Sequence, residues 1–268
     1  MISRRHLAAA AAVSVLLGTA LTGCGDKASS EVTLTVGATP VPHADILKFI
    51  APALKKEGIN LKVVEFSDYV KPNLALADKE LDANFFQHVP YLESFAGERN
   101  LKLSVLCAVH IEPMGVYSKT VKSLTDVPEG AKVAIPNDPT NGGRALKVLE
   151  NAGLITCKQG VGVEGTAAEV TVTRLKLKIV EHEAATLPRA LDDVTLAVIN
   201  SNFAMGVGLN PSKDALTIEA KDSPYANVVA VRTGDDRPAL KKLSEALRSV
   251  DVKKFIEDTY KGAVVPAF

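Results

Sequence analysis

Hydrophobic and polar positions alternate with two different periods along residues 32–268, and the two patterns follow each other repeatedly. Short apolar runs rich in β-branched residues predict strands, and apolar residues three or four positions apart predict helices. The first part of this pattern predicts strands over 32–38, 61–66 and 82–86 and helices over 44–56, 70–77 and 90–99. Because strands and helices alternate with short loops, we expect an α/β protein with a mostly parallel sheet and helices on both faces.

A second set of alternating elements follows an extended run, Leu103–Tyr117, and a polar stretch, Ser118–Glu129. The pattern predicts strands over 132–135, 177–180, 196–199 and 227–231, and helices over 142–152, 184–191, 237–250 and 253–260. Two such sets predict two βα domains, or lobes, with a ligand bound between them near the carboxyl ends of strands. We assign residues 32–116 with 228–268 to lobe one and 117–227 to lobe two, joined by crossover strands in Leu103–Tyr117 and Tyr225–Val231.

Residues 1–23 have the pattern of an export signal, in which two arginines precede an uncharged apolar stretch. That stretch, Leu7–Leu21, is shorter than the ~20 residues that a membrane-spanning helix needs. The string LTGC, ending at Cys24, resembles the bacterial lipobox, whose cysteine is acylated with fatty acids such as palmitate; the alternative is a cysteine that happens to end an ordinary signal. We expect an exported protein, periplasmic or outer-facing, anchored to the bacterial cell membrane through lipidated Cys24 and the tether 24–31.

Composition excludes several classes of protein. The chain has 31 Lys and Arg against 31 Asp and Glu, so it lacks the positive field that would hold nucleic acid. The signal removes two of the arginines, which leaves the mature protein slightly acidic. A hydrophobic content of 47% excludes disorder. Export permits a disulfide between Cys107 and Cys157, but both lie in or beside apolar runs, where free thiols are common.

Motifs of enzymes and metal sites fail on inspection. Gly160–Gly165 matches GxGxxG, but no buried strand precedes it and no long helix follows, so we expect no dinucleotide site. The string HEAAT at His182 lacks the second histidine of an HExxH metalloprotease. We therefore expect no catalysis and no cofactor. One alternative stays open beside four unrelated histidines, namely a zinc trap that combines a carboxylate with His43, His88, His110 or His182.

The segment from Ile135 to Arg144 has the chemistry of an anion site. It is a strand end, a proline-rich turn and a helix start. Free amide groups at a helix N-terminus attract a carboxylate, Gly142 and Gly143 permit close approach, and Arg144 supplies a two-pronged cation. The alternative is an ordinary capped helix with a solvent-facing arginine.

Aromatic residues are scarce, at 5% of the chain, yet they cluster at Asp68–Val70 and Asn84–His88. Alternation along a strand directs one of Phe85 and Phe86 into the core and the other to the opposite surface. Strand ends carry Asn200, Asn202 and Asn227, whose amides can converge between the lobes, although such positions also suit turns.

Longer strings resemble one family, the NlpA-type methionine-binding lipoproteins, which are the substrate-binding proteins of the methionine ABC importer. The resemblance runs from the lipobox to the terminal KGAVVPAF and includes VGATPVPHADIL, DYVKPNLALADKELDANFFQHVPYL, HIEPMGVYS, AIPNDPTNGGRAL, LPRALDDVTLAVINSN and SPYANVVAVR. It implies a type II periplasmic-binding-protein-like fold with two lobes. It also implies a monomer that binds methionine, delivers it to an ABC permease and its ATPase, and is not an enzyme.

The resemblance further implies the ligand-binding residues. In the family an arginine meets the methionine carboxylate, two asparagines meet its ammonium and carboxylate, and aromatic and histidine side chains enclose the thioether. The matching residues here are Tyr69, Phe86, His88, Asn141, Arg144, Asn200 and Asn227. Two departures from the family, in Thr156–Leu175 and at Phe203 where tyrosine is common, concern the surface of lobe two rather than the class of ligand.

Overall fold

The computed structural model describes residues 31–160, 164–220 and 224–268. The export signal, the lipobox cysteine Cys24 and nearly all of the tether lie outside the described residues, as does the centre of the GxGxxG match. The remainder, Glu31–Phe268, forms one compact unit.

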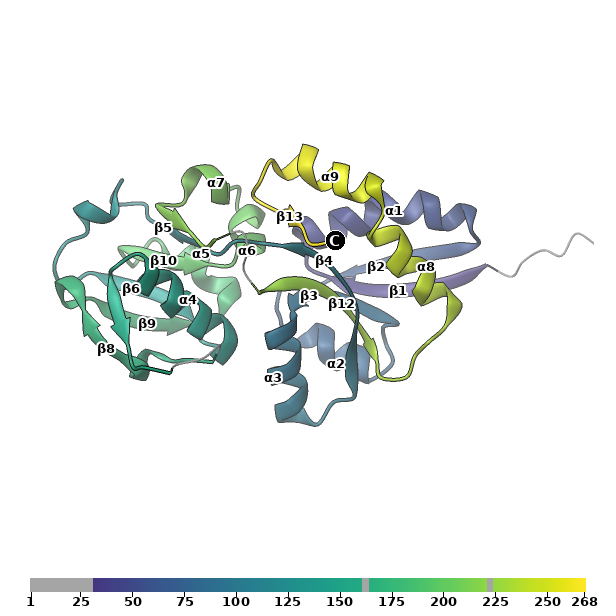
Figure 1. Ribbon diagram of the computed structural model, residues 1–268, viewed down its shortest axis with the longest axis horizontal. Coiled ribbons are helices and arrows are strands. Elements are labelled where there is room, and N and C mark those ends of the chain that lie inside the picture. The colour runs from purple at the N-terminus through teal and green to yellow at the C-terminus, as the bar shows by residue number, and fades with distance from the viewer. Residues whose placement is uncertain (1–30, 161–163, 221–223) are drawn as a thin grey trace, which may run out of the picture. The chain divides into compact units, whose positions relative to one another are not determined.

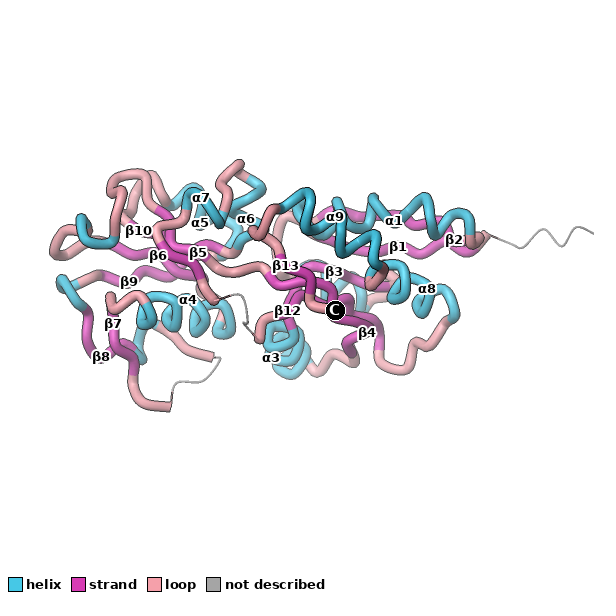
Figure 2. Tube along the Cα trace, turned by 45° about the horizontal axis from the view of Figure 1, so that its top comes forward, coloured by secondary structure: helices cyan, strands magenta, loops and turns pink. Residues whose placement is uncertain are grey.

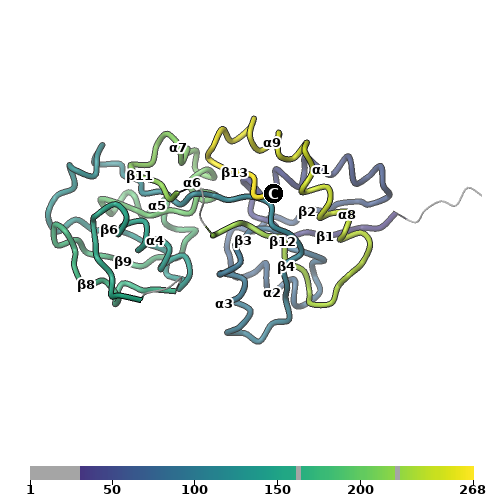
Figure 3. Tube along the Cα trace, viewed as in Figure 1, coloured from purple at the N-terminus to yellow at the C-terminus, as the bar shows by residue number. Residues whose placement is uncertain are grey.

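The first sheet has six strands in the order β13-β4-β12-β3-β1-β2. β1 runs parallel to β2 and β3, whereas β12 is antiparallel to β3 and β4. β12 therefore lies between strands that precede it by more than a hundred residues (Figures 1 and 3). The strands are β1 (Val32–Ala38), β2 (Ile59–Glu65), β3 (Ala83–His88), β4 (Leu103–Ile111), β12 (Ala226–Arg232) and β13 (Val265–Pro266).

Helices cover both faces of this sheet (Figure 1). On one face apolar side chains of α1 and α8 pack with residues of β1 and β3 in a large core. On the other face Leu76 and Leu92 pack against Val228 and Ala230 of β12. The helices of the first face are α1 (Asp45–Lys56), α8 (Pro238–Leu247) and α9 (Val250–Tyr260), and those of the second are α2 (Lys71–Ala77) and α3 (Val89–Arg99).

The second sheet has five strands in the order β11-β5-β10-β6-β9. β6 is parallel to β9 and β10, and β5 is antiparallel to β10 and β11. The strands are β5 (Gly115–Tyr117), β6 (Lys132–Pro136), β9 (Lys178–His182), β10 (Leu196–Ile199) and β11 (Thr217–Ile218). One core joins this sheet to α4 (Pro139–Asn151), and another joins its other face to α5 (Leu187–Ala190) and α6 (Ser201–Gly206).

Smaller elements complete the fold. The helix α7 (Pro211–Asp214) precedes β11, and short 3-10 turns occupy Leu124–Asp126, Ala167–Glu169, Arg174–Lys176 and Ala184–Thr186. An antiparallel pair, β7 (Ile155–Cys157) and β8 (Val170–Thr173), lies beside α4 (Figure 2). None of the helices in the described part of the chain is long and apolar enough to cross a bilayer.

The extended run Leu103–Tyr117 passes from one sheet to the other, because β4 ends in the first sheet at Ile111 and β5 begins in the second at Gly115. Pro113 lies in the connection, where its missing N–H costs no ladder bond, and its carbonyl accepts a hydrogen bond from Ser201. The expected helix 184–191 is a 3-10 turn followed by the short α5. The thiols of Cys107 and Cys157 are free, so the alternative of a disulfide between them is wrong.

Candidate ligand-binding site

A cavity of about 330 Å³, including its mouth, lies where residues that follow strands of both sheets come together. All seven residues that the sequence suggested for ligand binding line it. β3, the N-terminus of α4, the end of β10 and the start of β12 supply most of them. The complete lining consists of Tyr69, Phe86, Gln87, His88, Tyr91, Glu112, Asn141, Arg144, Asn200, Ser201, Asn202 and Asn227.

Three aromatic rings form one wall. The ring centroid of Tyr69 lies 5.8 Å from that of Phe86 and 5.7 Å from that of Tyr91. Alternation along β3 separates the two phenylalanines as expected, because Phe85 packs in the core between the sheet and α1 while Phe86 faces the cavity. Phe203, the departure from the family pattern, packs against Tyr69 from behind at 4.8 Å.

Amide and imidazole groups form the adjoining wall. The Oδ1 atom of Asn141 accepts hydrogen bonds from Nε2 of His88 at 3.1 Å and from Nδ2 of Asn200 at 2.8 Å. His88 accepts the backbone N–H of Tyr91 at Nδ1, so its proton is on Nε2 and the ring is neutral. Burial, aided by the charge of Arg144, lowers the pKa of His88 to about 3. The Oδ1 atom of Asn200 is buried with no hydrogen-bond partner among the described residues.

The helix start at α4 differs from the expected anion site. The Asp138 carboxylate caps the helix and accepts the N–H of Asn141 at 2.9 Å, so this amide is not free for a ligand. Gly142 has a packing role instead. A Cβ atom there would lie 3.0 Å from the carbonyl oxygens of Pro136 and Gly165. The amide of Asn141 and the space beside Gly142 are therefore not available to a ligand, and α4 contributes the side chains of Asn141 and Arg144 to the cavity.

Arg144 is buried, which makes the alternative of a solvent-facing arginine wrong. One edge of its guanidinium is already occupied, because Nε lies 3.1 Å from both carboxylate oxygens of Glu219 and Nη2 lies 2.5 Å from one of them. Nη2 also donates to the carbonyl of Glu112 at 2.7 Å, and the group lies over the ring of Tyr225 at 4.4 Å. Nη1 forms no hydrogen bond with any residue that the structure describes, so it is left to face the cavity.

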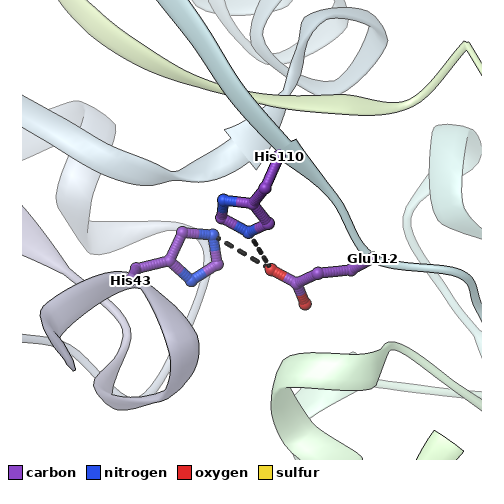
Figure 4. Close-up of side chains that lie close together, drawn as sticks. All are labelled: His43, His110 and Glu112. Carbon is purple, nitrogen blue, oxygen red and sulfur yellow. Dashed lines mark hydrogen bonds and ion pairs between the residues drawn. The ribbon is translucent and has the colours of Figure 1, made fainter. Parts of the chain in front are cut away.

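Behind the cavity, Glu112 forms a buried cluster with two histidines (Figure 4). Its Oε1 atom lies 2.7 Å from Nε2 of His110 and 3.2 Å from Nε2 of His43. Burial lowers the pKa of His43 to about 4 and that of His110 to about 3, so both rings are neutral, and Nε2 of His110 donates a hydrogen bond to Glu112. Burial raises the pKa of Glu112, while His43, Arg144 and the backbone N–H of Asn202 oppose this shift.

The four histidines of the zinc alternative do not come together. Within the described ranges the one group with metal-ligand spacing is His43, His110 and Glu112. His88 binds Asn141 in the cavity wall, and His182 lies half-buried at the end of β9. The Nδ1 atom of His110 has no partner, whereas metal-ligating histidines almost always donate their second N–H. This geometry favours a hydrogen-bonded carboxylate over a zinc site.

Sequence reasoning missed several groups of this site. Glu112 is a lone carboxylate between β4 and Pro113, and its position in an otherwise apolar run was the available signal. Glu219 meets Arg144 from 75 residues away, and no local pattern indicates that contact. Tyr91 was expected only as part of a helix, although its hydroxyl donates to the carbonyl of Tyr69 at 3.0 Å.

The comparisons with known proteins agree with this architecture. The NlpA lipoprotein family model matches residues 34–268. The methionine-binding lipoprotein MetQ of Bacillus subtilis is 44% identical over 255 residues, which cover 92% of this chain and 93% of that protein. The D-methionine-binding lipoprotein MetQ of Escherichia coli K12 is 40% identical and covers 95% of this chain and 96% of its own length.

Solved structures give the same result. A nutrient-binding protein from Burkholderia cenocepacia, solved bound to methionine, is 47% identical with a TM-score of 0.85, and the match covers 88% of this chain and all of that one. The structure of a putative methionine-binding lipoprotein of B. subtilis is 44% identical with a TM-score of 0.85, and the match covers 89% of this chain and 99% of that one. The prediction of a two-lobed periplasmic-binding-protein-like fold is thereby confirmed, and the chain belongs to the NlpA lipoprotein family.

Proposed function

We propose that this chain binds methionine in the cavity and delivers it to an ABC importer. The observation that carries the proposal is the combination, around one cavity, of an unpaired N–H face on Arg144, the carboxylate of Glu112 and an aromatic wall. A zwitterionic amino acid with an apolar, polarizable side chain is complementary to all three.

The ligand carboxylate would bind Nη1 of Arg144 and Nδ2 of Asn227. Neither nitrogen donates to another described residue. Asn227 is held in place because its Oδ1 atom accepts a hydrogen bond from Nε2 of His43 at 3.0 Å. Its amide nitrogen is therefore oriented before any ligand arrives, and hydrogen bonds from a charged donor and a fixed amide are strong when water is excluded.

The ligand ammonium would bind the carboxylate of Glu112 and the Oδ1 atom of Asn200. A buried acceptor without a donor costs about 1–3 kcal/mol, so the unpartnered Oδ1 of Asn200 gains from an incoming N–H group. Glu112 is buried and accepts a hydrogen bond from neutral His110, and the ligand ammonium would supply the cation that favours its ionised form.

The thioether would lie against the rings of Tyr69, Phe86 and Tyr91, with His88 at its edge. Sulfur–aromatic contacts add about 0.3–1.5 kcal/mol to the burial of the side chain. Because the low pKa keeps His88 uncharged, it offers an apolar ring face to the ligand.

The names of the relatives support this function, because the two MetQ proteins bind methionine or D-methionine by their descriptions. By analogy, the chain acts as a monomer, hands its ligand to the permease and ATPase of the importer, and carries out no catalysis. The cavity offers acceptors, donors and an apolar wall for binding, and no nucleophile with an adjacent base among its lining residues.

The test is native mass spectrometry of the purified protein, followed by calorimetry with L- and D-methionine. We expect an adduct with the mass of one methionine and binding of one ligand per chain. Zinc binding that EDTA reverses, with no heat on addition of methionine, would contradict the proposal.

We also propose that Cys24 is acylated and anchors the chain to the membrane. The export signal and lipobox pattern around it support this. In cells fed a labelled palmitate, the wild-type chain should carry label and fractionate with membranes, and the Cys24→Ser variant should do neither. Cys107→Ser, which removes a buried thiol, serves as the matched control and should keep its label.

A further inference from the structure

A largely buried ion pair beside the cavity joins Arg144 and Glu219. Glu219 uses both carboxylate oxygens on the Nε and Nη2 edge of Arg144, and the Arg144 side chain is only 3% exposed. Such a side-on pair fixes the plane of the guanidinium and leaves its Nη1 edge free. Glu219 is absent from the cavity lining, so it reaches a ligand only through Arg144.

Glu219 is itself held at two points. Its backbone N–H donates to the carbonyl of Met114 at 2.8 Å, and its Oε2 atom accepts the N–H of Met114 at 3.3 Å. Met114 is fully buried in the core of the second sheet. The carboxylate is therefore fixed to the framework beside β11 at the position where it meets Arg144.

This pairing changes the charge that a ligand meets. Arg144 and Glu219 cancel, and His43 and His110 are neutral, so the carboxylate of Glu112 is the uncompensated charge on the cavity lining. Asp138, which lies outside the lining and accepts hydrogen bonds from Asn141, adds negative charge, partly balanced by the positive end of α4. The cation that lines the cavity is thus already paired within the chain, and the carboxyl group of Glu112 is the acidic group that a ligand meets.

We propose that Glu219 is a specificity-determining residue: by neutralising Arg144 it makes the site select ligands by their α-ammonium group more than by their carboxylate. The proposal rests on the proposed function, since it concerns the amino-acid ligand of the same cavity. Its ligand class is the primary α-amines with an apolar thioether side chain, including those without a carboxylate. Acids without the amine are excluded because they would place a second negative charge beside Glu112.

The test compares three ligands by calorimetry. They are L-methionine, L-methioninol, which lacks the carboxylate, and 4-(methylsulfanyl)butanoate, which lacks the ammonium. The wild-type chain should bind methioninol more tightly than the butanoate by about tenfold or more. In Glu219→Gln the charge of Arg144 is no longer compensated, and the preference for methioninol over the butanoate should fall by about tenfold. Glu219→Asp, which keeps the charge, should leave the preference within about threefold of wild type even where all affinities weaken.

A merely structural role for Glu219 would weaken all three ligands by one common factor in both variants, and that result would overturn the proposal. Glu65→Gln, which removes a surface carboxylate paired with Lys48, is the matched control and should leave every affinity unchanged. If circular dichroism finds Glu219→Gln unfolded, the wild-type preference and its loss in Glu112→Gln decide instead. Wild-type binding of the butanoate as tightly as methioninol overturns this proposal alone, whereas no methionine binding overturns the proposed function with it.

Discussion

The hydroxyl of Tyr69 donates a 2.6 Å hydrogen bond to Oδ1 of Asn202. Tyr69 lies between β2 and α2 of the first sheet, and Asn202 lies in α6, which packs on the second. Both line the cavity, and the ring of Tyr69 also packs against Phe203. This bond therefore links the aromatic wall to the opposite side of the site, and we expect it to break when a ligand leaves past Tyr69.

Tyr69→Phe keeps the ring and removes this hydrogen bond. A hydrogen bond of this kind contributes about 1 kcal/mol, so methionine should dissociate about fivefold faster while its association rate stays nearly the same. Stopped-flow fluorescence or surface plasmon resonance measures both rates. Tyr117→Phe is the matched control, because the buried Tyr117 hydroxyl has no hydrogen-bond partner among the described residues. An unchanged dissociation rate in Tyr69→Phe would remove this contact from the release step.

Arg144→Ala should weaken methionine binding by about 2–5 kcal/mol, because it strips the ligand carboxylate of its charged partner. It should also lower the free energy of unfolding by about 3 kcal/mol, since Glu219 then lies beside the core without its cation. Calorimetry measures the first effect and urea denaturation the second. Lys147→Ala on the same helix removes an exposed cation paired with Glu150 and should change neither quantity. Normal methionine affinity in Arg144→Ala would exclude that residue from the site.

Asn227→Ala separates binding from stability. The change removes an amide that we expect to donate to the ligand, which should weaken binding by about 1–3 kcal/mol. The free energy of unfolding should change little, because Nε2 of His43 still has the Oε1 atom of Glu112 at 3.2 Å when the Asn227 amide is removed. Calorimetry and urea denaturation on the same variant test both parts. A large loss of stability with an unaltered dissociation constant would make Asn227 a structural residue instead.

The sequence predicted most of the fold because alternation and local apolar patterns determine strands and helices. Strand 196–199, for example, is β10 with the same bounds. The failures lie where tertiary contacts override the local pattern. The expected helix over 184–191 is a 3-10 turn followed by the short α5, and the apolar periodicity of this segment does not mark the break between them.

In the candidate site, too, local motifs predicted individual residues but not the contacts between distant segments. Motifs of consecutive residues led to Arg144, His88 and Asn227, all of which line the cavity. The ion pair of Arg144 with Glu219 was not predicted, because Glu219 lies 75 residues away, directly after the short strand β11. A pattern in one chain can identify a cation, but whether that cation is neutralised depends on packing between distant segments.

Three buried histidines predict how stability depends on pH. The pKa falls to about 4 for His43 and to about 3 for His88 and His110, mainly because burial disfavours the charged ring. In the unfolded chain these rings titrate near about 6.5. Between these values the unfolded state binds more protons than the folded state. Stability is therefore fully present above about pH 6.5 and is lost as the pH falls towards the folded pKa values.

The free energy of unfolding, measured by urea denaturation without methionine, should fall by about 1.4 kcal/mol per pH unit for each such proton as the pH is lowered from about 6 to about 4. His88→Gln removes one of the three buried rings. The slope of the free energy of unfolding against pH should therefore decrease by the contribution of one proton. An equal slope in His88→Gln and wild type would mean that His88 is protonated in the folded chain, and its place as a neutral wall of the methionine cavity would then be wrong.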